Sequence, residues 1–205
     1  MDEKIRYLLS EWPENIISKF RYDEVALYSI TPSHIAKKIA IKLRRICGKT
    51  ASIFDACACV GGDALWFVQL FNTVICCEID RKRYSYLKSN IKLVAKHNNH
   101  IEYNISCIDL IKNINFVDII YFDPPWGGPS YKDAEIIDLS LDGKDLTYWI
   151  PLFASKCNSI AIKGPSNLNT KPIIHTLHEE GFDTIIDKYK TSKTNYFLLL
   201  LAHKQ

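Results

Sequence analysis

Short apolar runs alternate with amphipathic stretches along most of the chain. From Ala51 onward, runs rich in β-branched and aromatic residues are separated by segments whose apolar positions recur at helical spacing. The runs cover residues 52–56, 73–78, 100–105, 117–122, 158–163, 183–188 and 195–202. This alternation predicts an α/β fold, with a mostly parallel sheet and helices on both of its faces.

The last two runs are joined only by the short polar link 189–194, which predicts an antiparallel hairpin at the edge of the sheet. A doubly wound, Rossmann-like sheet of seven strands ending in such a hairpin is therefore expected. Ligands of doubly wound sheets bind beyond the carboxyl ends of the strands, so candidate site residues are sought there.

The first 30 residues have a different pattern, with two weak helical stretches separated by Trp12-Pro13. Thr31 is predicted to cap a helix that has Pro32 at its first position and runs to about Cys47. We expect residues 1–30 to form a cap segment and residues 31–205 to form the main domain. Three aromatic residues of the cap segment could form a lid, although buried packing is the preferred interpretation: Trp12, Phe20 and Tyr22.

Composition narrows the class of protein. The 205 residues are 47% hydrophobic and 24% charged, as in an ordinary globular domain, and no apolar run reaches the roughly 18 residues of a membrane span. The net charge of +3 is compatible with a phosphate-bearing partner and equally with a plain basic surface. We expect no contact with membranes and a monomer.

The cysteines indicate a reducing compartment, because seven thiols cannot all pair within one chain and no signal peptide is seen. Cys57, Cys59, Cys76 and Cys77 lie in apolar surroundings without zinc-knuckle spacing, so they are predicted to be small buried hydrophobes. His175 and His178 have no nearby acidic or cysteine partner and are predicted to be surface residues. No metal site is expected.

The segment 123–129, Asp-Pro-Pro-Trp-Gly-Gly-Pro, follows the strand predicted at 117–122. Its prolines stiffen the backbone, so the acceptors of Asp123 and Pro124 are held rigidly beyond the strand end. Such acceptors suit an amine, and the ring of Trp126 can stack on a planar base. The motif therefore predicts methylation of an exocyclic amino group of a base.

Acidic residues also follow the three preceding strands. Asp55 leads into a turn that contains Gly61 and Gly62, Glu78 ends the second strand and could accept bonds from a ribose, and Asp109 follows the third strand. Each acid alone could be a solvated loop residue, and the glycine turn alone could be a simple strand-to-helix turn. Together with the motif at the fourth strand, they predict a binding line for S-adenosylmethionine.

With these motifs the chain resembles the trimethylguanosine synthases, the RNA cap guanine-N2 methyltransferases. The resemblance covers roughly residues 28–167 and rests on Tyr-Ser-Ile-Thr-Pro at 28–32, the turn at 55–62, Glu-Ile-Asp at 78–80, Asn90, Asp109, and the 123–129 motif with Tyr131. It implies a class I S-adenosylmethionine-dependent methyltransferase domain and, as partner, RNA with a 7-methylguanosine cap. The expected products are 2,7-dimethylguanosine or 2,2,7-trimethylguanosine caps.

The resemblance also assigns site residues. Catalytic roles are implied for Asp123, Pro124 and Trp126. The residues expected to hold the cofactor are Thr31, Pro32, Asp55, Cys57, Ala58, Gly61, Glu78, Ile79, Asp109, Leu110 and Asp123. Those expected to contact the capped substrate are Ser29, Asn90, Pro125, Trp126, Tyr131, Lys163 and Asn167, of which Lys163 and Asn167 would meet the cap phosphates.

The chain departs from the family pattern at two places. Cys59 stands where the first glycine of the cofactor turn is expected, and residues 163–167 differ from the family's usual basic loop. Alternative functions are a guanine-N2 or adenine-N6 methyltransferase of non-cap RNA or DNA, or a catalytically silent cap-binding module. By resemblance we expect an intracellular protein of the nucleus or nucleolus, with the cytoplasm as an alternative.

Overall fold

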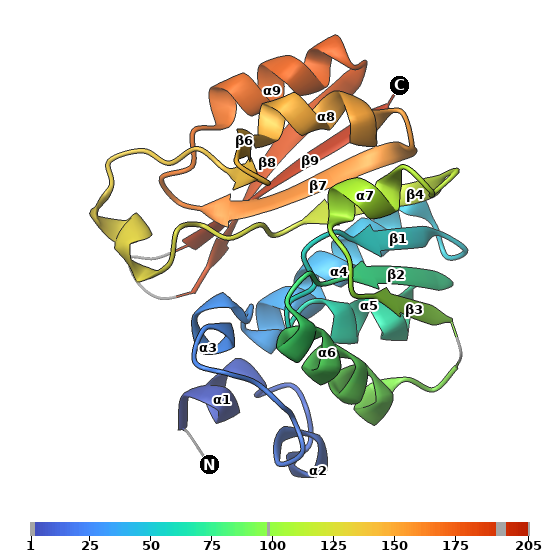
Figure 1. The fold of residues 1–205 in the computed structure, drawn as a ribbon, viewed down its shortest axis with the longest axis vertical. Helices are drawn as coiled ribbons and strands as arrows, with labels where there is room; N and C mark the ends of the chain where they lie inside the picture. Colours follow the sequence, from blue (N-terminus) through green and yellow to red (C-terminus); the bar gives the residue numbers. More distant parts are fainter. Residues whose placement is uncertain (1–2, 98, 192–195, 205) are drawn as a thin grey trace. The chain divides into compact units, whose positions relative to one another are not determined.

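The computed structural model describes residues 3–97, 99–191 and 196–204 (Figure 1). By their internal contacts, the residues form two compact units, Met1–Leu110 and Ile111–Gln205. Strands and helices alternate in both units, as expected of an α/β fold. The division predicted between residues 30 and 31 stays a prediction.

The first unit holds three parallel strands in the order β3-β2-β1. These strands are β1 (Ser52–Asp55), β2 (Thr73–Cys77) and β3 (His100–Tyr103). The helices of this part are α1 (Glu3–Leu8), α2 (Glu14–Ile17), α3 (Ala26–Ser29), α4 (Ser33–Cys47), α5 (Ala64–Leu70), α6 (Arg81–Val94) and α7 (Cys107–Ile111). In register, Asp55 pairs with Cys76, so β1 and β2 end at the same edge.

The second unit holds four long strands in the order β4-β7-β9-β8. They are β4 (Val117–Phe122), β7 (Cys157–Pro165), β8 (Phe182–Lys190) and β9 (Tyr196–Lys204). β4 and β7 are parallel, whereas β9 is antiparallel to both β7 and β8. The remaining elements are η1 (Pro129–Asp133), β5 (Ser140–Leu141), β6 (Lys144–Asp145), α8 (Leu146–Ala154) and α9 (Thr170–Glu179).

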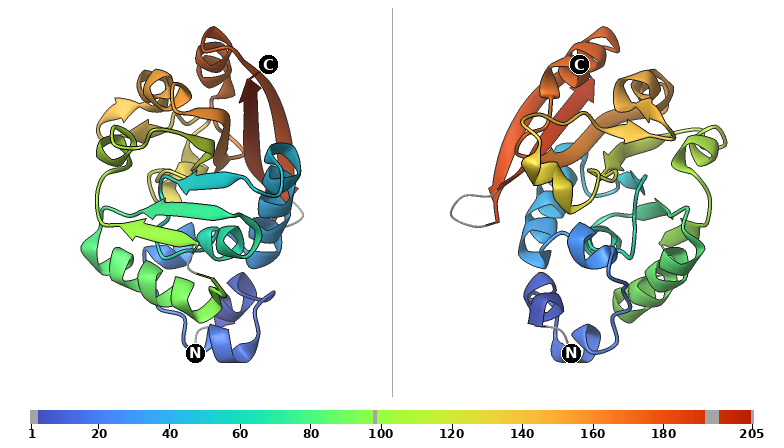
Figure 2. Two further views of the ribbon diagram at one scale, coloured as in Figure 1. Left: turned by 90° about the vertical axis from the view of Figure 1, so that its right-hand side faces the viewer. Right: turned by 60° about the vertical axis from the view of Figure 1, so that its left-hand side comes forward.

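Packing of α8 on its strands explains part of the second unit's core. The helix places Phe153 against Phe122 of β4, with ring centroids 4.7 Å apart and planes at 80°. α8 and α9 lie side by side over the strands (Figures 1 and 2). Both aromatic rings are fully buried, so this edge-to-face pair belongs to the apolar interior.

The predicted fold is confirmed: a mostly parallel seven-stranded sheet with antiparallel C-terminal strands and short N-terminal helices. Each predicted run contains a strand, although Asn195 lies outside the described residues. The fifth strand was predicted too short at both ends, since β7 covers Cys157–Pro165. The sequence pattern did not reveal β5 and β6, whose two-residue strands are shorter than any detectable alternation.

The predicted cap of the long helix is wrong by one residue. α4 begins at Ser33 with Pro32 as its N-cap, and the carbonyl of Pro32 accepts the first helical bonds from Ile35 and Ala36. Thr31 does not cap the helix, because its hydroxyl donates instead to Asp63 Oδ2 at 2.7 Å. The segment before α4 is therefore fastened to the turn that follows β1.

The approach between this segment and the turn is close enough to require glycine at position 62. A Cβ on Gly62 would lie 3.2 Å from the backbone nitrogen of Thr31 and 3.3 Å from Cγ2 of Ile30. A larger residue would have to push the two backbones apart. Glycine thus permits the buried Thr31–Asp63 bond to form.

The cysteines are all free thiols in the structure. Cys76 and Cys77 are buried as predicted, whereas Cys57 and Cys59 are only half-buried, because they lie in the turn beyond β1 rather than in a strand. Across the described ranges, none of the helices has the length and apolarity needed to cross a membrane.

A buried amide ties the N-terminal segment to α6. Asn90 is fully buried, and its Oδ1 accepts from the backbone N–H of Arg21 at 2.8 Å. Its Nδ2 donates to the carbonyls of Arg21 and Val60 at 2.8 and 2.9 Å. One side chain thereby satisfies three backbone groups in two separate segments, and it fixes the path of the chain around Arg21.

Asn90→Ala is expected to lower the free energy of unfolding by about 3 kcal/mol, because it leaves several buried backbone groups without partners at roughly 1–3 kcal/mol each. Ser89→Ala is the matched control: the neighbouring hydroxyl only bonds Ser85 O within the helix, and its loss should cost less than about 0.5 kcal/mol. Urea denaturation of both variants measures the difference. Equal stability of the two variants would contradict a stabilising role for the Asn90 hydrogen bonds.

Candidate active site

The turn after β1 carries several of the residues predicted to hold a cofactor. Asp55 ends the strand with only 1% of its surface exposed, and its Oδ1 accepts from Cys57 N–H at 3.4 Å. Gly61 N–H then bonds Ala58 O at 2.8 Å and closes the turn. Gly61 needs its glycine, since its φ is +100° and a Cβ there would lie 3.2 Å from Leu87 Cδ1. Because Gly61 has no Cβ, other groups can approach the backbone of this turn closely.

Cys59, which departs from the family pattern, has a backbone conformation that usually favours glycine. Its φ is +48°, in the left-handed region that disfavours residues with a Cβ, at a cost of about 1–2 kcal/mol. The turn keeps the path that a glycine would give it, at the expense of local strain. The thiol of Cys57, two residues earlier, has a raised pKa, chiefly because of its hydrogen bond with Cys107.

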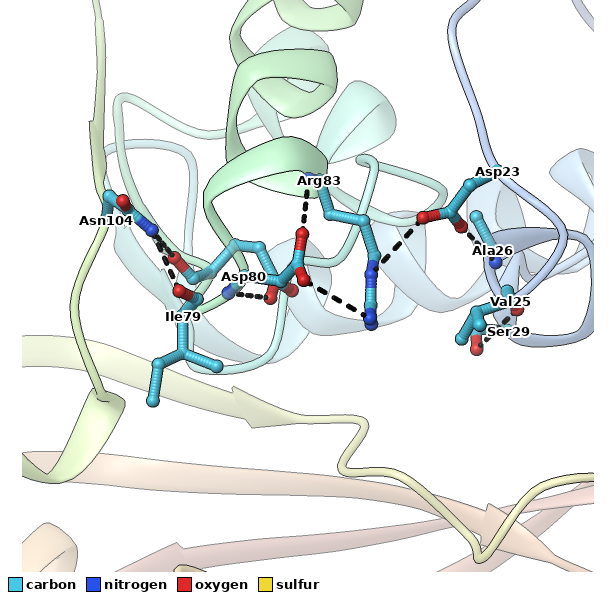
Figure 3. Close-up of polar contacts among 9 residues, drawn as sticks. Asp23, Val25, Ala26, Ser29, Ile79, Asp80, Arg83 and Asn104 are labelled. Atoms are coloured by element: carbon cyan, nitrogen blue, oxygen red, sulfur yellow. Dashed lines mark hydrogen bonds and ion pairs between the residues drawn. The ribbon is translucent and has the colours of Figure 1, made fainter.

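The turn after β2 is fixed by bonds at both of its sides (Figure 3). Glu78 Oε1 accepts from Asp80 N–H at 2.7 Å, and Asn104 Nδ2 donates to the carbonyls of Glu78 and Ile79 at 2.8 and 3.0 Å. Burial raises the pKa of Glu78, partly offset by the bond from Asp80. Ile79 is nonetheless 72% exposed. A rigid turn thus combines a buried carboxyl with an exposed apolar side chain.

The same turn is linked to the cap segment through Arg83. Its Nε lies 3.6 Å from Asp23 Oδ2, and its guanidinium also lies 3.6 Å from Asp80 Oδ2. Asp23 in turn accepts from Ala26 N–H at 2.8 Å and starts α3 (Figure 3). Sequence reasoning missed this link, although a basic first turn opposite an acidic segment was a usable signal.

The remaining first-unit predictions fall in different settings. Asp109 follows the third strand as predicted and is exposed on the short helix α7, and Leu110 beside it is buried. Ser29 is exposed at the end of α3 and its hydroxyl donates to Val25 O at 3.2 Å. Asn90 serves the fold, and no donor or acceptor of its amide faces solvent. The ligand contacts of all these residues stay predictions.

Lys163 and Asp123 form an ion pair in the second unit, with Lys163 Nζ 2.6 Å from Asp123 Oδ2. The register explains it, because Phe122 pairs with Ile162 across the parallel strands β4 and β7 and the next residue on each strand is Asp123 and Lys163. Only 1% of the Lys163 side chain and 15% of the Asp123 side chain is exposed. The motif carboxylate therefore has a buried counter-charge.

Lys163 was predicted to end the fifth strand, at the start of a loop that would meet the cap phosphates, but the strand continues beyond it. Lys163 lies inside β7, opposite Leu199 of β9, because the strand continues to Pro165. Its ammonium is buried against Asp123 and is not presented to a phosphate in this structure. The predicted strand stopped at Lys163, so the register that pairs this lysine with Asp123 was not foreseen.

Trp126 is half-buried and held by two aromatic rings. Tyr131 and Phe197 each lie with ring centroids 5.3 Å from that of Trp126, at interplanar angles of 89° and 68°. Lys163 Nζ lies 5.7 Å from the ring centroid of Trp126 and 5.3 Å from that of Phe197. The indole, the ion pair and two aromatic edges are thus gathered in one cluster. Phe197 was not among the predicted site residues.

The chain after Trp126 turns back on itself, through Gly127 and Gly128 at φ values of +89° and +76°. Tyr131 N–H then bonds Gly128 O at 3.2 Å, which returns Tyr131 to the indole. Asn167 fastens this loop, since its Nδ2 donates to Tyr131 O and Ala134 O at 2.9 and 2.7 Å. The amide predicted to meet a phosphate therefore anchors the loop, and its predicted substrate contact stays a prediction.

Similar proteins point to the same class of enzyme. The family model described as RNA cap guanine-N2 methyltransferase matches residues 50–200. An uncharacterized protein, L320, of Acanthamoeba polyphaga mimivirus is 29% identical over 201 residues, which is 96% of this chain and 73% of that protein. Trimethylguanosine synthase of Schizosaccharomyces pombe is 27% identical over 135 residues, which is 62% of this chain and 56% of that protein.

Solved structures show the same fold at low identity. A putative RNA methyltransferase, PH1948, from Pyrococcus horikoshii aligns with a TM-score of 0.60 at 16% identity, covering 100% of this chain and 97% of that one. The family match spans both units and includes β1 to β8 with the motif at 123–129. The chain therefore belongs to the RNA cap guanine-N2 methyltransferase family.

Proposed function

We propose that the protein transfers a methyl group from S-adenosylmethionine to the exocyclic N2 of the 7-methylguanosine cap of RNA. The observation that carries the proposal is the cluster in which the half-exposed indole of Trp126 lies beside the Asp123–Lys163 pair. A stacking face next to a fixed carboxylate suits a planar base that carries an amine. The family match supports methyl transfer to guanine N2 as the reaction.

The first unit has groups that fit S-adenosylmethionine. The turn at 55–63 offers backbone at close range to the methionine end, Glu78 can accept bonds from ribose hydroxyls, and the exposed Ile79 can pack on the adenine. The rigidity of the Glu78–Ile79 turn favours binding, because its backbone is already fixed by Asn104 and loses little freedom when a ligand binds. When bound, S-adenosylmethionine supplies an electrophilic methyl group on a sulfonium.

Asp123 is assigned the role of holding the amine. Its carboxylate and the rigid carbonyl of Pro124 accept hydrogen bonds from N2–H, which directs the nitrogen lone pair toward the methyl and stabilises positive charge as it develops on nitrogen. Such positioning can lower the activation free energy by roughly 7–11 kcal/mol. The nitrogen proton leaves after the N–C bond forms and passes to water or to Asp123.

Lys163 is assigned the role of positioning Asp123. An ammonium 2.6 Å from one carboxylate oxygen fixes the rotation of the carboxyl group and balances its charge. The pair is neutral as a whole, so Lys163 does not repel a positively charged base near Trp126. Removing Asp123 alone would leave a buried cation 5.7 Å from the indole centroid, facing the site of a cationic ligand.

Trp126 is assigned the role of stacking on 7-methylguanine. The methylated base carries a positive charge, so a cation–π attraction adds to stacking. Tyr131 and Phe197 pack against the indole in T-shaped arrangements and restrict its rotation. Burial raises the pKa of Tyr131, so its phenol is neutral at neutral pH and can donate a hydrogen bond to the cap.

Incubation with 7-methyl-GTP and S-adenosylmethionine, followed by mass detection, tests the function directly. We expect the nucleotide to gain one or two methyl groups, with GTP as the poorer acceptor. Uncapped RNA and DNA serve as competing substrates. Methylation of these alone, with none of 7-methyl-GTP, would transfer the proposal to a non-cap methyltransferase, and calorimetric binding of 7-methyl-GTP without S-adenosylmethionine binding would indicate a silent cap-binding module.

Trp126→Ala should raise the dissociation constant of 7-methyl-GTP at least about tenfold, since base stacking is worth about 1–3 kcal/mol. Trp126→Phe keeps an aromatic face for stacking, so it should lose less affinity for 7-methyl-GTP. Isothermal titration with 7-methyl-GTP and with GTP measures both effects, and the alanine variant should lose more affinity for the methylated base. An unchanged affinity for 7-methyl-GTP would refute the stacking role.

Lys163→Met should lower kcat for 7-methyl-GTP at least about tenfold, with a smaller effect on KM, because the unpaired carboxylate loses its fixed orientation. Lys163→Arg keeps the charge and should recover part of the activity. Lys171→Met removes an exposed lysine from α9 and is the control for charge alone. Breaking a buried pair can cost about 3–5 kcal/mol, so thermal melting must accompany the kinetics.

The double variant Asp123→Asn/Lys163→Met separates positioning from folding. With both charges removed, stability should return toward that of the wild type, while kcat should stay low. If the double variant recovered both stability and kcat, the pair would be structural only and its catalytic role would be wrong.

A further inference from the structure

The exposed face of α6 carries a concentration of positive charge that the proposed chemistry does not use. The helix holds five basic residues and no acidic one within its 14 positions. Its inward side is formed by Leu87, Asn90, Ile91 and Val94, which are buried. The exposed cations lie on the opposite side: Arg81, Lys82, Lys88 and Lys92.

These four exposed cations form no ion pair with any residue of the described ranges. The fifth basic residue, Arg83, differs, since it pairs with Asp23 and Asp80 and fastens the cap segment. The Lys82 and Lys88 ammonium groups lie near rings of their own helix, 5.8 Å from the Tyr86 centroid and 5.5 Å from the Tyr84 centroid. The charges are therefore displayed to solvent among aromatic side chains.

A shallow depression runs along this face, and every residue that lines it is a hydrogen-bond donor. None of the lining side chains is a carboxylate. The lining residues are Arg81, Tyr84, Ser85, Lys88, Ser89, Lys92 and Asn104. Except for Asn104, they recur three or four positions apart along α6, so they form a stripe about 16 Å long. That length matches several consecutive phosphates of a nucleic acid strand.

The placement of the cations runs against helix stability. Arg81 and Lys82 lie in the first turn of α6, where the positive end of the helix dipole disfavours cations by about 0.3–1 kcal/mol each. The N-cap Asp80, which accepts from Arg83 N–H at 2.8 Å, stabilises the same turn against this cost. Residues that oppose the local stability of their own helix point to a function outside the fold.

The sign of the charge is specific to this part of the chain. Residues 1–110 hold 16 basic and 12 acidic residues, whereas residues 111–205 hold 10 basic and 11 acidic ones. The protein's positive excess thus belongs to the unit that carries α6. The exposed stripe has no large aliphatic side chain or tryptophan, which disfavours insertion into a membrane surface. Cations interleaved with tyrosines are instead typical of a surface for single-stranded nucleic acid.

We propose that this stripe binds the sugar–phosphate backbone of the substrate RNA downstream of its cap. The inference rests on the proposed function, because that function makes RNA the substrate. α6 begins just after Glu78, so its cationic first turn lies at the edge of the strands where the cofactor residues of the same unit lie. RNA held there gains affinity that an isolated cap nucleotide lacks.

The double variant Lys88→Gln/Lys92→Gln tests the proposal. KM for methylation of a capped oligoribonucleotide should rise about tenfold, and the salt dependence of its binding should weaken by about 1.4 in the slope of log K against log salt, for two lost contacts to a single strand. KM and kcat for 7-methyl-GTP should not change. The matched control is Lys38→Gln/Arg45→Gln, which removes two exposed cations from α4.

The outcomes separate this inference from the proposed function. Fluorescence anisotropy with an uncapped oligoribonucleotide measures the stripe without any methyl transfer. Weaker binding by the α6 variant alone supports the stripe even if 7-methyl-GTP is not methylated. Equal binding by wild type and α6 variant overturns it, and so does an equal loss in the α4 control. Binding of phosphatidylserine vesicles that depends on Lys88 and Lys92, without RNA binding, also overturns it.

Discussion

Parallel pairing of strands in register is the constraint on which the candidate site residues of each unit depend. In a parallel ladder the carboxyl ends of neighbouring strands meet at one edge, so residues far apart in the sequence become neighbours there. In the second unit this register makes Asp123 the neighbour of Lys163. In the first unit it aligns the end of β1 at Asp55 with β2, which ends just before Glu78. The register of the strands therefore decides which site residues become neighbours.

Much of this architecture could be predicted because it depends on local patterns. Runs of β-branched residues bounded by polar turns predicted all seven long strands and the antiparallel C-terminal pair. The motif at 123–129 was also recognisable in the sequence, since two prolines and a tryptophan after a strand have few purely structural explanations. Acids at strand ends were found for the same reason: strand ends are visible in the sequence.

Other features depended on long-range contacts that no local pattern contains. Asn90 was predicted to contact a base, but its burial and its bonds to Arg21 and Val60 follow from how a distant segment passes over α6. Lys163 was predicted to end its strand and to meet a phosphate, although a lysine seldom occupies a buried strand position unless it is paired. Only the register with β4 reveals its partner. Phe197 reaches Trp126 through antiparallel pairing of β9, which fixes its position opposite Pro165.

The buried pair of Asp123 and Lys163 has a consequence for how the site can change over evolutionary time. Either residue alone would leave one charge stranded in an apolar interior, so each restricts which residues can replace the other. The two positions should therefore covary: a relative with a neutral residue at 123 should carry a neutral one at 163 as well. Few paths connect such forms, since each single substitution removes one partner of a buried ion pair.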